Sequence, residues 1–140
     1  MMIRLLKFAL ATLFLSSHLL ANTNFFDEGL ALYKNNDLEK AKFKFEQDLV
    51  FNPKSEKSYL YLSRIFNIQK KKELEEKNLN TVILLNPKNE EAVFNLAKLR
   101  LDQSDYKGSK KLIEQLLNFC KNYCQKSTQL KIQIDNSSKK

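Results

Sequence analysis

A phrase of eight residues occurs twice in this chain of 140 residues. Residues 49–56 read LVFNPKSE and residues 83–90 read ILLNPKNE, so the same order of apolar residues, Asn-Pro-Lys and Glu returns after 34 residues. Proline ends a helix and pushes the residue before it out of the helical region, and the Ser or Asn that follows is suited to begin another helix. A fixed period of this length is typical of an array of stacked helical pairs.

Amphipathic segments fill the sequence on both sides of the repeated phrase. Only two glycines and two prolines occur, which argues against a turn-rich β fold and favours helices. Apolar residues recur at helical spacing, and short polar breaks separate the segments. We therefore predict an all-α fold whose helices cover residues 25–34, 38–51, 56–68, 73–85, 90–101, 106–122 and 125–134.

Residues at equal offsets from the repeated phrase resemble the pattern of the tetratricopeptide repeat (TPR). The small position in the first helix of each pair holds Gly29, Ser63 and Ala97. The bulky position in the second helix holds Phe45, Leu79 and Ile113. The resemblance implies an α-solenoid of three helix-turn-helix repeats at about 22–55, 56–89 and 90–123. A capping helix at about 125–134 and a polar tail at 135–140 would follow.

Two residues of the second helices depart from the TPR pattern. The position that wants a small residue early in the second helix holds Ala41, Glu75 and Ser109, so the second repeat has a carboxylate there. Asp48 stands in the first repeat where alanine is usual. We expect these departures to affect local packing and to leave the architecture intact.

Residues 1–21 have the order of a Sec-type signal peptide. Arg4 and Lys7 precede the apolar stretch 8–15, and Ala21 is a small residue at the expected cleavage site. The apolar stretch is short for a membrane span of roughly 20 residues; an uncleaved anchor is the alternative, and the only route to membrane contact. No cysteine lies near the cleavage site, which argues against a lipoprotein. We expect a periplasmic or secreted protein with its TPR domain at 22–134.

Removal of that segment would also remove His18, the only histidine. Without it the mature chain lacks the usual general base and the commonest metal ligand. The sequence has no Gly-rich phosphate loop, no zinc-ligand spacing and no nucleophile motif. We therefore expect no catalytic residues, no metal site, no cofactor and no small-molecule substrate.

The resemblance to TPR proteins implies a concave groove lined by the first helix of each pair. Eight groove positions carried over one by one are Phe26, Tyr33, Lys57, Tyr61, Arg64, Phe94, Asn95 and Lys98, and Lys34, Leu60, Asn67 and Leu101 are further positions of the same helices. Aromatic, basic and amide side chains suit an extended peptide or a partner helix with acidic groups. Lys57, Arg64 and Lys98 are predicted to form a basic stripe for such a segment. The carboxylate-clamp pattern of chaperone-binding TPR proteins is not reproduced, so we do not assign that ligand.

Cys120 and Cys124 stand where a third copy of the repeated phrase would fall. Two cysteines in an oxidising compartment favour a disulfide. Four residues apart on an intact helix the bridge would be strained, and it would form more easily if the helix breaks near residues 122–123. A structural disulfide, two free thiols and a redox or metal role all remain open, although the Cys-x-x-Cys-His motif of haem attachment is absent.

Together these features predict a non-enzymatic protein-interaction module, an adaptor or scaffold in the assembly of an envelope complex. Two other interpretations remain open. The chain could be a structural subunit that binds through its outer surface, or a thiol-redox accessory protein. Nucleic acid is not expected as a partner, because the lysines are dispersed among acidic residues.

Overall fold

Seven helices make up residues 24–138, the part of the chain that the structure, a computed structural model, describes. They are α2 (Phe25–Lys34), α3 (Leu38–Phe51), α4 (Glu56–Ile68), α5 (Lys72–Leu85), α6 (Glu90–Asp102), α7 (Tyr106–Leu117) and α8 (Cys124–Ser137). The expected signal peptide at 1–21 lies outside the described residues, so it stays an expectation.

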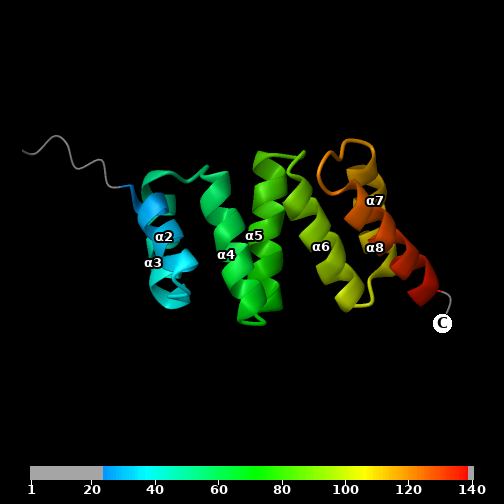
Figure 1. Ribbon diagram of the computed structural model, residues 1–140, viewed down its shortest axis with the longest axis horizontal. Helices are drawn as coiled ribbons and strands as arrows, with labels where there is room; N and C mark the ends of the chain where they lie inside the picture. The colour runs from blue at the N-terminus through cyan, green and yellow to red at the C-terminus, as the bar shows by residue number, and fades with distance from the viewer. Residues whose placement is uncertain (1–23, 139–140) are drawn as a thin grey trace, which may run out of the picture.

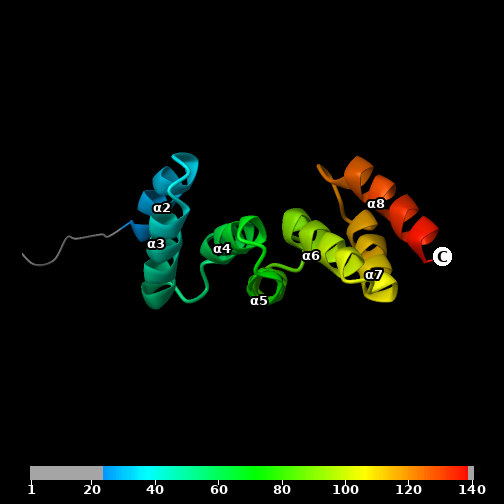
Figure 2. The ribbon, with the colours of Figure 1, turned by 90° about the horizontal axis from the view of Figure 1, so that it is seen from below.

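The helices form antiparallel pairs that stand side by side in a row (Figure 1). The pairs are α2–α3, α4–α5 and α6–α7, and each packs on the next. Helix α8 packs on α7 and also touches α6, so it covers the last pair. A view from below shows α2 and α8 at opposite ends of the row (Figure 2). The predicted all-α fold of stacked helix pairs is confirmed.

The turn inside each pair has the same geometry in all three copies. Asn36, Lys70 and Ser104 share one register of the repeat and have left-handed backbone angles, with φ of 61°, 57° and 62°. In each turn the next N–H donates to a carbonyl five residues earlier, that of Leu32, Phe66 or Arg100. This is the Schellman motif, which satisfies the last carbonyls of the first helix. None of the three residues is glycine, and their side chains differ. The backbone conformation of the turn is therefore the same in all three pairs although the residue is not.

Small residues bring the two helices of a pair close together. In the first pair, a Cβ atom on Gly29 would lie 2.8 Å from Cε1 of Phe45, too close for a larger residue. Ser63 and Ala97 occupy the same register of the next two pairs, and both are buried. The bulky residues of the second helices are fully buried as well: Phe45, Leu79 and Ile113. Each such side chain contributes about 1.5–3 kcal/mol through burial, so the core follows the 34-residue period.

The segments that connect one helix pair to the next element, residues 52–55, 86–89 and 118–123, are called joints below. A glutamate at the start of a helix pair accepts hydrogen bonds from the joint that follows that pair. Glu56 opens α4, and its carboxylate accepts hydrogen bonds from the side-chain amides of Asn86 (3.1 Å) and Asn89 (2.5 Å) after α5. Glu90 has the same register in the next pair and accepts the backbone N–H groups of residues 121–123 at 2.8 to 3.0 Å. These donors, beginning with the N–H of Lys121, hold the pKa of Glu90 below its ordinary value. The second and third joints are thus each attached to the first helix of the pair before them.

The third joint differs from the sequence prediction. A helix was predicted over 106–122, but α7 ends at Leu117. The N–H groups of residues 121–123 donate to Glu90 and not to carbonyls four residues earlier, so the helix cannot continue there. The last helix begins and ends further out than predicted, at Cys124 and Ser137.

The residues that follow the repeated prolines behave differently in the two copies. Asn89 caps α6, because its side-chain oxygen accepts the N–H of Ala92 at 2.8 Å. Ser55 precedes α4 but makes no capping hydrogen bond with its side chain. Its hydroxyl donates instead to that of Ser58, which in turn donates to the buried carboxylate of Asp48. The first joint therefore uses its serine for a buried polar cluster in place of a cap.

Candidate functional site

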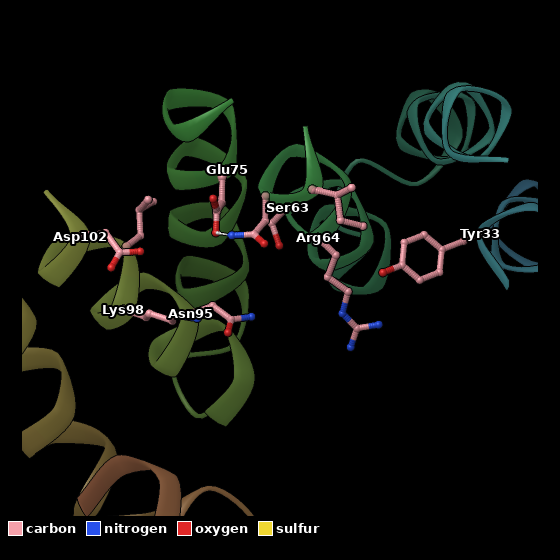
Figure 3. Close-up of a pocket in the computed structure, with 10 residues that line it drawn as sticks. Tyr33, Ser63, Arg64, Glu75, Asn95, Lys98 and Asp102 are labelled. Atoms are coloured by element: carbon pink, nitrogen blue, oxygen red, sulfur yellow. Dashed lines mark hydrogen bonds between the residues drawn. The ribbon is translucent and has the colours of Figure 1, made fainter. Parts of the chain in front are cut away.

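A pocket of about 220 Å³ opens between the first helices of the three pairs, with α5 closing one side. It brings together four of the eight residues predicted for the groove: Tyr33, Arg64, Asn95 and Lys98. It also contains Asn67, one of the further predicted positions, and two acidic residues outside the groove prediction, Glu75 and Asp102. Figure 3 shows Glu75 in the middle of this group, with Asp102 and Lys98 to one side and Tyr33 across the opening.

Three polar side chains of the pocket have no partner within the described chain. Asn95, Lys98 and Asp102 make no side-chain hydrogen bond or ion pair with any residue of 24–138. All three come from α6, the first helix of the third pair. Polar groups gathered in a hollow without protein partners are the groups that fix a ligand in place.

Arg64 already has a partner inside the protein. Its Nε and Nη2 atoms each donate to an oxygen of the Glu91 carboxylate at 2.6 Å, which makes a bidentate ion pair between α4 and α6. The guanidinium also lies over the ring of Tyr61, 4.4 Å from its centroid. The hydrogen bonds to Glu91 keep the pKa of Arg64 above its ordinary value. Arg64 therefore stabilises the wall of the pocket and leaves little of its charge for a ligand.

The structure does not assemble the predicted basic stripe. Arg64 is neutralised by Glu91, and Lys57 lies with its Nζ 5.8 Å from the centroid of Phe26, away from the pocket. Of the three residues, Lys98 alone lines the pocket without an ion pair, beside the carboxylates of Glu75 and Asp102. The charge of this part of the groove is mixed, where the sequence predicted it to be basic.

Two of the predicted aromatic residues belong to the core of the first two pairs. The rings of Phe26 and Tyr61 lie 5.7 Å apart, and each packs on the buried ring of Phe45. Tyr33 meets Tyr61 edge to face at 5.1 Å, yet it still lines the pocket. Aromatic pairs of this kind contribute about 0.5–1.5 kcal/mol beyond burial, so these rings chiefly stiffen the groove wall.

A second hollow of about 260 Å³ continues from Lys98 toward α8. Phe94 and Leu130 supply its apolar part, and Lys126, Gln129 and Gln133 of α8 supply polar groups. The prediction placed Phe94 in the groove but assigned no groove residue to the capping helix. The sequence contains no repeat of this helix to compare it with, so its contribution could not be found from the period.

Glu75 is the buried acid of the first pocket. Its side chain is only 4% exposed, and one oxygen, Oε1, accepts a hydrogen bond from the Asn67 amide at 3.0 Å. Burial raises the pKa of Glu75, and the Asn67 hydrogen bond partly opposes this. The departure of Glu75 from the TPR pattern was the one feature of the sequence that could have marked it.

Cys120 and Cys124 are joined by a disulfide in the structure, with Cα atoms 5.3 Å apart. Cys124 is the first residue of α8 and Cys120 lies in the loop after α7, so the bridge does not span an intact helical turn. The closed loop carries Tyr123, whose ring packs against Phe94 with centroids 5.4 Å apart. The bridge thus lies next to the second hollow.

Within residues 24–138 no group of three or more His, Cys, Asp or Glu side chains is placed to hold a metal ion. Across the same residues, no helix combines the length and the hydropathy of a membrane span.

Solved structures share this arrangement of helices. The first TPR domain of Spaghetti (RPAP3), bound to the HSP90 peptide SRMEEVD, matches with a TM-score of 0.75 and 16% identity over 83% of this chain and 91% of that chain. The chain has the TPR fold. The Sgt2 TPR domain from Aspergillus fumigatus matches with a TM-score of 0.69 and 20% identity, over 83% of this chain and 80% of that chain.

A bacterial chaperone has the same fold. SycD of Yersinia enterocolitica, a type III secretion chaperone in complex with a peptide of the translocator YopD, matches with a TM-score of 0.73 and 12% identity, over 87% of this chain and 97% of that chain. At these identities the likeness extends to the fold alone. No protein-family model matches the sequence, and no curated protein matches it either.

Proposed function

We propose that this protein is a non-enzymatic interaction module whose concave groove binds an extended peptide or helix of a protein partner. The observation that supports this most directly is the pocket of α2, α4 and α6, where Asn95, Lys98 and Asp102 lie without protein partners. Asn95 is placed to form hydrogen bonds with a peptide backbone, and Lys98 and Asp102 can form ion pairs with charged side chains of the peptide. The peptides bound to RPAP3 and SycD support a groove of the same fold as the place for such a ligand.

We also propose that the protein is exported and works as an adaptor or scaffold of an envelope complex. The order of residues 1–21 supports export, as set out above. The disulfide between Cys120 and Cys124 fits the same location, because disulfides persist in oxidising compartments. Fractionation of the producing cells, with mass spectrometry of the mature N-terminus, tests this part. A full-length protein that stays in the cytoplasm would overturn it.

Site-specific photo-crosslinking in the native cells tests the groove. A crosslinking residue at position 95 reports on the pocket, and one at the exposed Leu84 of α5 reports on the outer surface. We expect a discrete protein adduct from position 95 that disappears when Asp102→Lys is added, because this change reverses the charge of one of the unpartnered groups of the pocket. Adducts from position 84 alone would overturn the groove as the binding surface.

An outer-surface interface is the second candidate, and exposed apolar side chains support it. Phe43 and Val50 on α3 and Leu84 on α5 are 57%, 76% and 81% exposed. None of them lines the pockets described above. The same crosslinking experiment separates this structural-subunit role from the groove role, since each predicts an adduct at a different position.

A thiol-redox role is the third candidate and rests on the bridged cysteines alone. Alkylation of the purified native protein with a maleimide tests it. A structural disulfide predicts no labelling until a strong reductant is added, whereas a thiol-transfer protein predicts rapid labelling already in a mildly reducing glutathione buffer.

A further inference from the structure

Glu75 breaks the internal repeat at a position where the fold requires only a small side chain. In the first and third repeats the same register holds Ala41 and Ser109, both 0% exposed. The second repeat buries a carboxylate there, although burying a charged group is unfavourable unless it is paired. Because alanine or serine satisfies this place in two copies of the same stack, packing alone does not explain the glutamate.

Only one of the two oxygens of Glu75 is satisfied by the protein. The Asn67 amide donates to Oε1, and no donor of residues 24–138 reaches Oε2. Oε2 is nevertheless not sealed in the interior, since Glu75 lines the open pocket and this oxygen is absent from the buried unsatisfied atoms of the described chain. An acceptor with a free lone pair therefore faces the space where a ligand would lie.

The two acids that line the pocket have no ion pair within the described chain. Glu75, Asp102 and Glu91 contribute three carboxylates, and Arg64, Lys98 and Lys72 contribute three cations. Arg64 is paired with Glu91 through both Nε and Nη2 of its guanidinium. The Nζ atom of Lys98 lies more than 4 Å from every carboxylate oxygen of the described chain. The carboxylates of Glu75 and Asp102 are thus left without an ion pair, next to the apolar side chains of Ile68 and Leu99.

We propose that this pocket is a specificity site for a lysine or arginine side chain of the bound peptide. The cationic head would bond Oε2 of Glu75 and the carboxylate of Asp102, and the aliphatic stem would lie on Ile68 and Leu99. This proposal rests on the proposed function, and it names the charge of the ligand at this point of the groove as basic. It differs from the acidic segment that the sequence alone predicted.

Selection of random twelve-residue peptides on the purified full chain tests the proposal. We expect the selected peptides to share a Lys or Arg at one position. A synthetic pair that differs only by Lys→Gln at that position should differ on the order of 10- to 100-fold in Kd, the value of a charge-assisted hydrogen bond in a partly buried site. Glu75→Gln should bring the two peptides within about threefold of each other, because its neutral amide cannot pair with the cation.

The control is Glu73→Gln, which removes an exposed carboxylate from the first turn of the same helix. It should keep the full preference for the Lys peptide. If Glu75→Gln fails to fold, Glu75→Ser replaces it, because Ser109 shows that serine fits this register. Thermal unfolding of each variant identifies any loss of fold before binding is measured.

The outcomes separate the two proposals. Selected peptides that bind through Asn95 and Lys98 but show no Lys or Arg preference would overturn the specificity site and leave the groove function intact. The same holds if the preference survives Glu75→Gln. Failure to select any peptide that depends on the groove residues would overturn both.

Discussion

Two buried acids, Asp48 and Glu75, stand where the repeat pattern wants a small residue, and the fold treats them differently. Each is 4% exposed. Asp48 lies at the first joint, where the Ser58 hydroxyl donates to Oδ2 at 2.5 Å and the Asn52 amide to Oδ1 at 2.9 Å. Glu75 lies beside the pocket with a single donor, Asn67.

The difference is visible in the direction of the two pKa shifts. Burial alone would raise the pKa of Asp48, but the hydrogen bonds from Ser58 and Asn52 lower it below the ordinary value. Burial raises the pKa of Glu75, and its one hydrogen bond does not cancel the effect. A buried acid that departs from the repeat pattern can thus have both oxygens hydrogen-bonded and stabilise a joint, as Asp48 does. It can also keep one oxygen without a donor and line a pocket, as Glu75 does.

The largest expected effect is on Asp48. Asp48→Ala should lower the free energy of unfolding by about 2–3 kcal/mol, because it leaves the buried Ser58 hydroxyl without an acceptor and opens a small void. Urea unfolding followed by circular dichroism measures the change. A loss below about 0.5 kcal/mol would mean that the cluster is not stabilising.

A double-mutant cycle sharpens this expectation. Ser58→Ala alone should cost about 1–2 kcal/mol, because Asp48 loses one of its donors. The pair Asp48→Ala with Ser58→Ala should be less destabilised than the sum of the single changes by about 1 kcal/mol or more, since both partners of the hydrogen bond are gone. Simple additivity would show that the two groups act independently.

The two acids should respond to pH in opposite directions. The lowered pKa of Asp48 means that its contribution is present near neutral pH and is lost as pH falls through its folded-state pKa, so the deficit of Asp48→Asn should shrink in acid. The raised pKa of Glu75 means that the folded state is penalised as pH rises above the ordinary glutamate range. The advantage of Glu75→Gln should therefore grow between about pH 4 and pH 7. Urea unfolding across this range tests both, and parallel profiles would contradict the contrast.

The smallest expected effect is on the stability of Glu75→Ser. We expect a change within about 1 kcal/mol, with the variant equal to or more stable than the natural chain, because serine fits this register and removes a poorly satisfied charge. Thermal unfolding measures it. A loss of more than about 2 kcal/mol would make Glu75 a structural residue, like Asp48.

The sequence was sufficient for the fold because the fold repeats. The period placed Gly29, Ser63 and Ala97 at the close helix contacts, and the caps and prolines set most helix ends within one or two residues. The end of α7 was missed because Glu90 takes three N–H groups from a segment more than thirty residues away. No local propensity encodes such a contact.

The site was predicted less completely, for the same physical reason. Of the positions carried over on the first helices, Tyr33, Arg64, Asn95 and Lys98 line the pocket. The charge of the pocket depends on pairs between repeats, such as Arg64 with Glu91, and on Glu75 from a second helix. Those pairs require the stacking geometry, which a list of positions on one helix face does not contain.

The long reach of Glu56 and Glu90 also bears on how the chain is made. Each glutamate finds its donors 30 to 33 residues later, so a growing chain cannot complete one helix pair until the next joint has left the ribosome. For the last pair that moment comes with residues 121–123, beside the cysteines. The final joint therefore closes only after residues 121–123 have been synthesised, and a chain that stalls before them would end in a pair without these hydrogen bonds.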